Sequence, residues 1–534
     1  MRNFKKWLMA MRHPPTLEAG KRVINVAVYT ISFNQIFYSS LRLIYALLLS
    51  MIFMNVTLAN ENSDCDVNVS NSSELQNAIT NAVNSGKVIC LASGTYMPTS
   101  GSDRGISFNI TISDIVLRGA GEEATILSGN IGAPNNNTDN SQHVVTVRNQ
   151  TDVTLKSLTI SDGYNDQVVD ALNISGNGWG AGLLAVLSDI TLDKVHVRNN
   201  DHAWFGGGIG TINSTITIKN SVISHNSASF SGGGIYSDDI NSVYMPGTKI
   251  PDPNNPYPLG KETIMNTVIE DNLSFRETGA FLRGNTSLDV KNSVIRNNHV
   301  TSSGSPTAGL LALGIDPLFT TDFTGSISIK NTLVEDNVAG RHGGLRLLAF
   351  DSIEVTNSTI KENTGGASAG LEMDGFDNGL VRGNTFEENV SVDSAAAILS
   401  LRCTSLTVDN NTFNGNVSAG SLLTFGGLTL GVGGAIYSQA CDTIITKNTF
   451  MDNKAAFGGG AIYTKQDSIS WFGHLLKTGG NIVELSKNTF KGNVAPAGTG
   501  EHILCDGGAT ILDAEKNTFK MPGVSGVVNC GAGL

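Results

Sequence analysis

A short motif that recurs down the chain constrains the fold more than any other feature of the sequence. Its pattern is Asn-[Ser/Thr]-x-[Val/Ile/Phe]-x-x-Asn, clear at 220–226 and 357–363, and later copies begin Asn-Thr-Phe. The shortest spacing between closing asparagines is 26 residues, and longer spacings add an insertion to the same unit. Such a period indicates one structural unit per repeat. The closing residues are Asn200, Asn226, Asn272, Asn298, Asn337, Asn363, Asn389, Asn416, Asn453 and Asn493.

Each unit also contains two further strand signals. An alternating stretch such as Thr-Ile-Thr-Ile-Lys (215–219) precedes the motif and is typical of a strand with one buried face. Before it comes Gly-Gly-[Gly/Ala]-Ile-Tyr, as at 232–236 and 459–463. Three strands in 26 residues leave no room for a helix, so consecutive units must stack strand on strand at about 4.8 Å. We therefore predict an all-β fold, a right-handed parallel β-helix (solenoid).

The residue types in the motif suit stacking. The Val, Ile or Phe in its middle is expected to point inward and to form an apolar ladder from coil to coil. Equivalent asparagines at turns can exchange amide hydrogen bonds between coils and tolerate left-handed backbone angles. We therefore interpret the repeated asparagines as structural rather than catalytic.

The cysteines predict disulfide bonds. They are even in number and contain no Cys-x-x-Cys pair, which favours an oxidising compartment over a zinc site. Aligning Ile398 with Ile436 places Cys403 and Cys441 at equivalent positions of successive coils, within the Cα separation that a disulfide accepts. We expect Cys65–Cys90 to tie down the first coil and Cys505–Cys530 the last.

The first 59 residues read as a long basic signal peptide. They contain seven basic residues and one acidic residue, followed by an apolar run at 43–54 and a small-residue end at Ala59. A retained membrane anchor is the alternative, although a spanning helix normally needs about 20 apolar residues. We predict cleavage near Ala59 and hence a secreted or cell-surface protein.

The remainder divides into an N-terminal cap with the first coils (60–130) and the β-helix repeats (131–534), with an insertion at 238–262. Residues 72–83 have the apolar spacing of a helix at Leu75, Ile79 and Val83, with Ser before Glu as an N-terminal cap. A short capping helix here would cover the open edge of the first coil.

Two known groups of proteins resemble parts of the chain. The alternation of Gly-Gly-Ala-Ile (433–436, 459–462) with Phe-x-x-Asn (386–389, 450–453) resembles the repeats of the chlamydial polymorphic outer membrane proteins. The opening segment, with GKVICLASGTY at 86–96, looks like the start of pectate-lyase-like β-helix proteins. The first resemblance implies a surface-exposed passenger used in adhesion. About 40 residues follow the last full motif copy, too few for a transmembrane β-barrel, which weakens an adhesin role.

Catalysis on this fold requires acids clustered across neighbouring coils. The residues that follow the inward position of each glycine-rich strand form a mostly apolar and aromatic stripe. It reads Leu184, Gly210, Tyr236, Leu282, Leu311, Arg346, Glu372, Leu399, Tyr437 and Tyr463. Its best polar cluster is Arg346, Glu372 and Asp374, with Asp377 and His342 nearby, and a solvated ion pair is the simpler interpretation. No metal site or cofactor is indicated; calcium is the one ion that enzymes on this fold often use.

These observations favour a binding protein over an enzyme. We expect the contact surface to include Tyr236, Tyr437 and Tyr463 on the stripe and Tyr244 and Tyr257 in the proline-rich insertion. A polysaccharide or a host or cell-surface protein is the expected partner of a monomeric protein. A net charge of −12 argues against nucleic acid. The alternative is a polysaccharide lyase, hydrolase or epimerase centred on Arg346, Glu372 and Asp374.

Overall fold

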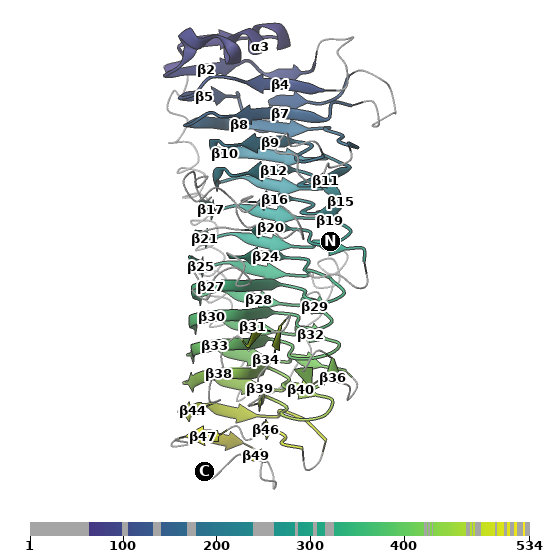
Figure 1. The fold of residues 1–534 in the computed structure, drawn as a ribbon, viewed down its shortest axis with the longest axis vertical. Coiled ribbons are helices and arrows are strands. Elements are labelled where there is room, and N and C mark those ends of the chain that lie inside the picture. The colour runs from purple at the N-terminus through teal and green to yellow at the C-terminus, as the bar shows by residue number, and fades with distance from the viewer. Residues whose placement is uncertain are drawn as a thin grey trace, which may run out of the picture. The chain divides into compact units, whose positions relative to one another are not determined.

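The computed structural model shows a stack of β-strand coils with a short helix at its N-terminal end (Figure 1). The structure describes residues 64–528 apart from internal gaps, so the leader (1–59) lies outside the described residues. The gaps are 99–104, 132–139, 168–177, 239–260, 284–286, 303–306, 315–324, 421–423, 426–427, 430, 466–469, 472–473, 476–481, 497–498, 507–509, 513–516 and 521–526. No helix in the described ranges is long and apolar enough to cross a membrane.

The strands of the coils form three faces of the stack. On each face, equivalent strands of successive coils pair in parallel and in register. Face 1 begins at the glycine-rich segment and holds β4 (Ile106–Ile110), β7 (His143–Arg148), β9 (Leu183–Val186), β12 (Ile209–Ile212), β16 (Ile235–Asp238), β20 (Ala280–Arg283), β24 (Leu310–Leu313), β41 (Ile462–Lys465), β46 (Ile503–Asp506) and β49 (Val527–Val528). Four long strands continue from face 1 into face 2: β27 (Leu345–Thr356), β30 (Leu371–Arg382), β33 (Ile398–Asp409) and β38 (Ile436–Thr446).

Face 2 contains the alternating segments and face 3 the asparagine motifs. Face 2 holds β1 (Val67–Val69), β2 (Lys87–Leu91), β5 (Ile115–Arg118), β13 (Thr215–Lys219), β17 (Lys261–Met265), β21 (Ser287–Lys291), β25 (Ser326–Lys330), β44 (Ile482–Ser486) and β47 (Thr510–Leu512). Two strands bend from face 2 into face 3: β8 (Val153–Ser161) and β10 (Asp189–Arg198). Face 3 holds β3 (Gly94–Tyr96), β6 (Thr125–Ser128), β14 (Val222–Ser224), β18 (Val268–Glu270), β22 (Val294–Arg296), β26 (Leu333–Glu335), β28 (Thr359–Lys361), β31 (Thr385–Glu387), β34 (Thr412–Asn414), β39 (Thr449–Met451), β45 (Thr489–Lys491) and β48 (Thr518–Lys520).

Most middle coils contain a fourth, very short strand that the sequence reading did not anticipate. These strands follow the closing asparagine and form two small parallel sheets, here called the flank, on the right of Figure 1. The first is β11 (Ala203–Phe205), β15 (Ser227–Ser231), β19 (Leu273–Ser274) and β23 (His299–Val300), and the second is β29 (Thr364–Gly365), β32 (Val390–Ser391), β35 (Val417–Ser418) and β40 (Lys454–Ala455). Two hairpins, β36 (Thr424–Phe425) with β37 (Leu428–Thr429) and β42 (Ser470–Trp471) with β43 (His474–Leu475), complete the strands.

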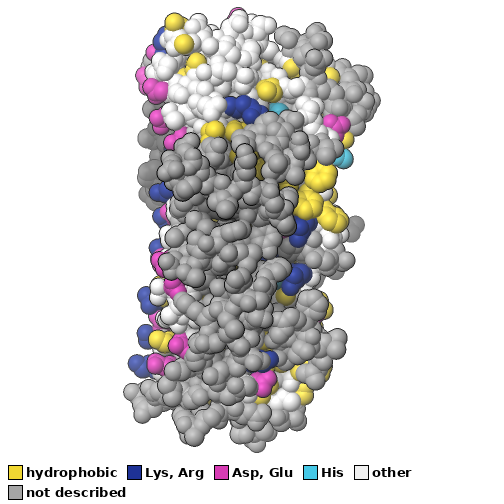
Figure 2. Space-filling view, viewed as in Figure 1, with side chains coloured by type: hydrophobic (Ala, Val, Ile, Leu, Met, Phe, Trp, Pro, Cys, Tyr) yellow, Lys and Arg dark blue, Asp and Glu magenta, His cyan; other side chains and the backbone are white. Residues whose placement is uncertain are grey.

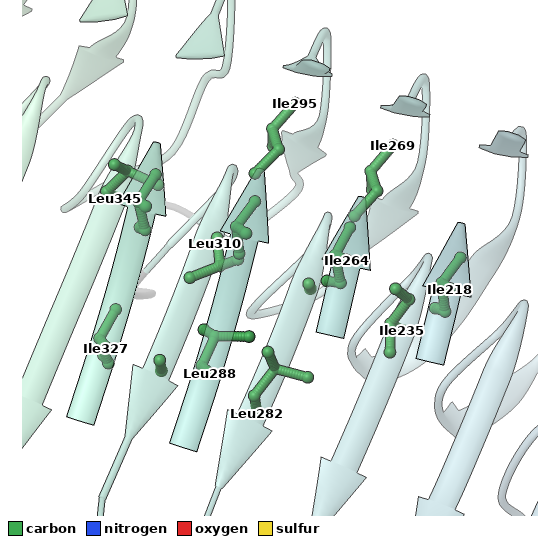
Figure 3. Packing of buried hydrophobic residues seen from close by; sticks show 14 of the residues in the cluster. Ile218, Ile235, Ile264, Ile269, Leu282, Leu288, Ile295, Leu310, Ile327 and Leu345 are labelled. Carbon is green, nitrogen blue, oxygen red and sulfur yellow. The ribbon is translucent and has the colours of Figure 1, made fainter. Parts of the chain in front are cut away.

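The core lies between the three faces. Aliphatic side chains from each face converge there, for example Ile218, Ile235 and Ile269, and all three are fully buried (Figure 3). Toward the C-terminus the middle residue of the motif becomes phenylalanine. The rings of Phe386, Phe413, Phe450, Phe490 and Phe519 stack coil on coil, with centroids 4.8–5.0 Å apart and planes within 4–9° of parallel. The predicted inward ladder is therefore confirmed.

The closing asparagines form the predicted amide ladder. Asn363, for example, accepts from the side chain of Asn337 at 3.0 Å and donates to that of Asn389 at 3.1 Å. The first residue of each Asn-Thr-Phe copy does not align with the first residue of the earlier copies, as the shared motif had suggested. Asn384 lies over Ser358 of the previous coil rather than over Asn357. The opening asparagine of these copies thus forms a second buried ladder.

The capping helix α3 (Ser72–Thr80) is shorter than expected and is capped differently. Its N-cap is Asn71, whose Oδ1 accepts from the backbone N–H of Glu74, while the Glu74 carboxylate accepts from the N–H of Ser70. Leu75 and Ile79 are buried as predicted. Val83 is not on the buried face, because the helix ends before it and a 3-10 turn (Ala82–Asn84) leaves it exposed.

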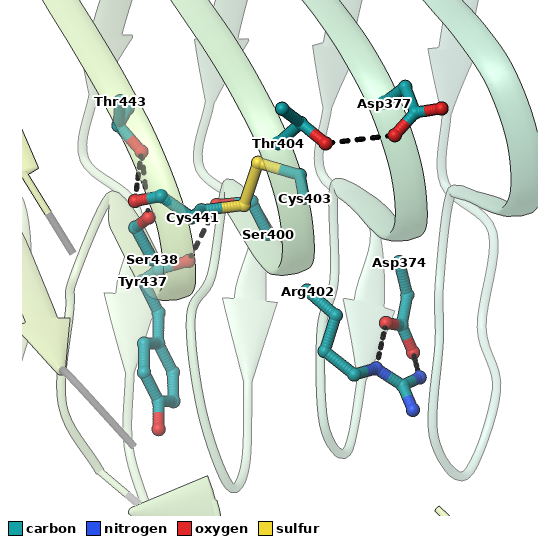
Figure 4. The surroundings of a disulfide bond; sticks show 10 residues. All are labelled: Asp374, Asp377, Ser400, Arg402, Cys403, Thr404, Tyr437, Ser438, Cys441 and Thr443. Carbon is teal, nitrogen blue, oxygen red and sulfur yellow. Dashed lines mark hydrogen bonds and ion pairs between the residues drawn. A yellow bond between two sulfur atoms is a disulfide. The ribbon is translucent and has the colours of Figure 1, made fainter. Parts of the chain in front are cut away.

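Two predicted disulfides are present. Cys65–Cys90 joins the start of the cap to β2, and Cys403–Cys441 joins β33 to β38 with a Cα separation of 4.7 Å (Figure 4). The register Ile398↔Ile436 that predicted the second bridge is also observed. Cys505 is disulfide-bonded, and its predicted partner Cys530 lies outside the described residues.

Candidate functional site

The outer side of face 1 carries the charged cluster that the sequence singled out. Glu372, on β30, lies 3.3 Å from the Arg346 Nε of the preceding coil and 2.5 Å from the Nδ1 of His342. Asp374, two residues along the same strand, is held by two nitrogens of Arg402 from the following coil (Figure 4). Glu372, Asp374, His342 and Arg402 are all buried. Stacking three consecutive coils therefore pairs every carboxylate in the cluster with a cation.

The pKa values of Glu372 and Asp374 are shifted in opposite directions. Burial alone would raise the pKa of Glu372, but His342 and Arg346 outweigh it and hold that pKa below its usual range. Burial raises the pKa of Asp374 despite the opposing guanidinium of Arg402. Paired carboxylates with pKa values pushed apart occur in general acid–base sites, although buried structural ion pairs have the same signature.

Sequence reasoning placed Arg346, Glu372 and Asp374 together but missed Arg402. The structure keeps Asp377 out of the cluster, because its carboxylate accepts a hydrogen bond from Thr404 at 2.8 Å (Figure 4). Arg402 has a left-handed backbone (φ 50°). That conformation breaks the alternation from which outward residues were counted, so the pattern gave no signal for Arg402.

The aromatic stripe on face 1 is not the open contact surface that the sequence suggested. Tyr236, Tyr437 and Tyr463 are all buried. The phenol of Tyr437 donates to Gln439 at 2.7 Å, and that of Tyr463 donates to Asp506 at 2.9 Å. These side chains do point away from the central core, but they lie in hydrophobic clusters of their own.

One stripe position was also misread. Phe281, not Leu282, pairs with Tyr236, because Ala280 occupies the inward position taken by Ile235 one coil earlier. Leu282 lies in the central core. Tyr244 and Tyr257 of the insertion lie outside the described residues.

Exposed aromatic and aliphatic side chains gather on the flank instead. Trp204 and Phe275 are 37% and 49% exposed, and Phe230 between them is half-buried. The Trp204 and Phe230 rings stack with centroids 6.0 Å apart, and the guanidinium of Arg276 lies 5.3 Å from the Phe230 centroid. In Figure 2 hydrophobic side chains gather at this edge, at the height of β11, β15 and β19, with basic side chains next to them. Aromatic residues three or four positions after Asn200, Asn226 and Asn272 are the sequence signal that could have revealed it.

The row of apolar residues continues along the flank. Leu273, Val338, Val390 and Val494 are exposed, and each occupies the same position of its coil. His299, Thr364 and Lys454 occupy that position in coils between them. The flank therefore presents an interrupted apolar row beside the aromatic residues.

A group of carboxylates elsewhere has the spacing of a cation site. Oxygens of Glu335, Asp336 and Glu362 lie within 4.8 Å of one another. The ammonium of Lys361 lies 3.0 Å from Glu335 and 3.4 Å from Glu362. Because Lys361 already pairs with two of these carboxylates, and Arg296 lies 3.9 Å from Glu335, we assign no metal to the group.

A buried histidine on face 1 makes stability depend on pH. His143 Nδ1 lies 2.9 Å from the Gly180 carbonyl oxygen, and burial lowers the pKa of His143 to about 4. The unfolded chain, with the ordinary value of 6.5, takes up a proton between pH 6.5 and 4 that the folded chain does not. Acidification across this window therefore destabilises the fold, at about 1.4 kcal/mol per pH unit and roughly 3 kcal/mol in total.

We expect the His143→Gln variant, whose amide can still donate to Gly180, to lose this part of the pH dependence. Urea unfolding of both proteins at several pH values between 7 and 4 measures it. As the pH falls, the free energy of unfolding of the parent should decrease more steeply than that of the variant. If the two free energies change in parallel with pH, His143 is not the source of this pH dependence.

Comparison with known protein families identifies the fold. A family model described as right-handed β-helix region matches residues 263–533. No curated protein matches this sequence. The A-module of the mannuronan C-5 epimerase AlgE6 from Azotobacter vinelandii is 14% identical, with a TM-score of 0.46, covering 86% of this chain and 98% of its own.

Two further solved structures illustrate the spread of functions. The Streptococcus pneumoniae surface adhesin PfbA is 12% identical, with a TM-score of 0.42, over 83% of this chain and 88% of its own. The catalytic unit of a Streptomyces thermodiastaticus α-1,3-glucanase is 13% identical, with a TM-score of 0.32, over 88% of this chain and 68% of its own. At this level of likeness we draw no conclusion about the present chain from these structures. Neither the family model nor these structures singles out the polymorphic outer membrane proteins.

Proposed function

This chain belongs to the right-handed β-helix family, and we propose that it is an exported binding protein that holds a polysaccharide or a surface protein against its flank. The observation that carries this proposal is the exposed aromatic and aliphatic surface of the flank, with Trp204, Phe275 and Leu273 at one end. Contiguous exposed apolar surface on a soluble protein usually marks a site of interaction. A stack of hydrogen-bonded coils is a rigid support for such a surface.

The buried charges of face 1 fit a structural role better than a catalytic one. A catalytic carboxylate must reach the substrate, yet Glu372 is 4% exposed and its oxygens face His342 and Arg346. Asp374 is engaged by Arg402. Removing one partner of such a cluster would leave a buried charge without compensation, which explains the residue choices without invoking a reaction.

A polysaccharide lyase, hydrolase or epimerase is the second candidate. The opposite pKa shifts of Glu372 and Asp374, on neighbouring outward positions of one strand, favour it. In that reading Asp374 would supply a proton, while Arg346 would offset the charge of a uronate.

Export follows as part of the proposal. The basic leader with its apolar run supports secretion, and the two disulfides are typical of proteins that mature in an oxidising compartment. We expect the exported protein to act as a monomer at or outside the cell surface.

Incubation of the purified protein with polygalacturonate, alginate and neutral glucans separates the two candidates. We expect retention on at least one immobilised polysaccharide or on intact cells, with no new reducing ends and no unsaturated products. Turnover that disappears in Glu372→Gln or Asp374→Asn, both confirmed as folded by circular dichroism, would overturn the proposal. The control is Glu354→Gln, which alters a half-exposed carboxylate paired with Lys330 on face 2. Absence of binding to every polysaccharide and to cells also contradicts it.

A further inference from the structure

Three aromatic side chains on successive coils of the flank form what we call the aromatic platform: Trp204, Phe230 and Phe275. Each lies three or four residues after the closing asparagine of its coil. The paired strands β11, β15 and β19, at one edge of the stack in Figure 1, place these three segments on successive coils. Trp204 and Phe230 are stacked, and their planes differ by 28°. The platform therefore presents aromatic residues on three successive coils.

The platform is fixed from behind by buried rings. Phe205 contacts Phe230 edge-to-face with a centroid separation of 5.6 Å. Phe205 in turn packs against Tyr236 at 4.6 Å and against Trp179 at 5.0 Å. Tyr236 and Trp179 are buried, so Phe230 and the Trp204 ring stacked on it rest on an aromatic core and lose little freedom when a ligand binds.

A basic side chain lies beside the platform. Arg276 follows Phe275 directly, its N–H donates to the Phe230 carbonyl at 2.8 Å, and its guanidinium lies over the Phe230 ring. Within the described part of the chain no carboxylate pairs with Arg276, although acidic residues outnumber basic ones by 47 to 35. A guanidinium left available beside aromatic rings can bind a carboxylate through two parallel hydrogen bonds.

We infer that the aromatic platform with Arg276 is a subsite for a carboxylated polysaccharide, an inference that rests on the proposed binding function. The exposed aromatic surface of Trp204 and Phe275 takes the apolar side of a pyranose ring, and Arg276 takes the carboxylate of a uronic acid unit. Coils repeat at about 4.8 Å, a step close to the length of one pyranose unit, so successive sugars can meet successive coils.

The size of the platform favours a glycan over a protein partner. At roughly 150–250 Å² for each ring, the exposed fractions leave about 300 Å² of aromatic and Leu273 surface. A stable protein interface needs about 800 Å² from each partner. Polar side chains also surround the rings, since His202, Ser229 and Thr301 are exposed, and hydroxyl groups of a sugar require such partners.

Calorimetric titration with short oligogalacturonates tests the inference, with the methyl-esterified oligomers as a neutral comparison. At about 0.15 M salt the Debye length is about 8 Å, so distant carboxylates of this acidic chain are screened while contacts to Arg276 persist. We expect Trp204→Ala and Phe275→Ala each to weaken binding of both oligomers by about tenfold, equivalent to about 1.4 kcal/mol. Arg276→Gln should remove the preference for the carboxylated oligomer and leave binding of the ester unchanged.

Two exposed residues away from the flank provide matched controls. Ile444→Ala removes exposed apolar surface from face 2 and Lys491→Gln removes a cation from face 3, and neither should alter binding. The inference is overturned if oligogalacturonate does not bind, if the ester binds as tightly as the acid, or if the platform variants bind like the parent. The inference is also overturned if the protein binds no glycan but self-associates, or binds another protein, in a way that Trp204→Ala abolishes. If a polysaccharide binds the parent and the platform variants equally, the subsite inference fails but the proposed binding function does not. If the protein turns over a polysaccharide, the proposed binding function fails, and the subsite is not thereby excluded.

Discussion

Replacement of Phe413 by alanine is expected to lower the free energy of unfolding by about 4 kcal/mol. Its ring is fully buried and lies between those of Phe386 and Phe450, at centroid distances of 5.0 and 4.8 Å. Backbone hydrogen bonds on every face fix the spacing between coils, so the neighbouring rings cannot move together to fill the cavity. The shift in the midpoint of guanidinium unfolding, combined with the slope of the transition, measures the effect.

Phe519 is the matched control for this change. It belongs to the same ladder and stacks on Phe490 at 4.9 Å, but it is 43% exposed. Phe519→Ala should therefore cost only about 1 kcal/mol, because much of its ring is already in water and the cavity is open. Equal losses for the two variants would show that the ladder does not owe its stability to enclosed packing.

The ladder itself was predictable because a parallel stack in register copies each position of one coil onto the next. A hydrophobic residue at the centre of the motif must therefore face the core in every coil, whichever of Val, Ile or Phe occupies it. The same logic predicted Cys403–Cys441, since two cysteines at equivalent positions lie one strand spacing apart. A repeat thus determines both the fold and the neighbours of each repeated side chain.

Errors arose where the repeat changes its residues. Around Ala280 a single glycine and an alanine replace the usual Gly-Gly-Ile. The repeat pattern therefore indicated Phe281 as the inward residue and Leu282 as the outward one, whereas Ala280 is inward and Phe281 outward. In the Asn-Thr-Phe copies the motif is one residue shorter, and Asn384 takes the place of Ser358. A displacement of one residue exchanges the two sides of a strand, and local composition gives no warning of it.

The surface was less predictable than the core. Whether an outward residue such as Tyr437 is exposed depends on side chains and segments that do not follow the repeat. Nothing in the alternation of the strands distinguishes the buried Tyr437 from an exposed tyrosine. The exposed platform residue Trp204 lies in the short flank strand β11, and Phe275 directly follows β19; the three-strand interpretation of the unit left both segments unassigned.

The second large effect is expected at the asparagine ladder. Asn363 is fully buried, and its Oδ1 accepts from the backbone N–H of Asn337 at 3.2 Å. Its Nδ2 donates to the carbonyls of Val334 and Lys361, both at 2.9 Å, as well as to Asn389. Asn363→Ala leaves these buried groups without partners at a cost of about 1–3 kcal/mol for each unsatisfied group. We expect a total loss of about 4 kcal/mol, measured by urea unfolding.

Asn363→Asp separates hydrogen bonding from side-chain volume. The carboxylate has nearly the same shape and still accepts from Asn337, but it cannot donate, so it faces the oxygens of Val334 and Asn389 in a buried site. We expect Asn363→Asp to be at least as destabilising as Asn363→Ala at neutral pH, because burying an unpaired charge costs more than losing a neutral amide. Asn414→Ala, which removes a half-buried amide bonded only to Glu387 at 3.0 Å, should cost less than about 1 kcal/mol. If Asn363→Asp retains the stability of the parent, the ladder is maintained by shape alone, and the donors of its amides do not hold the coils together.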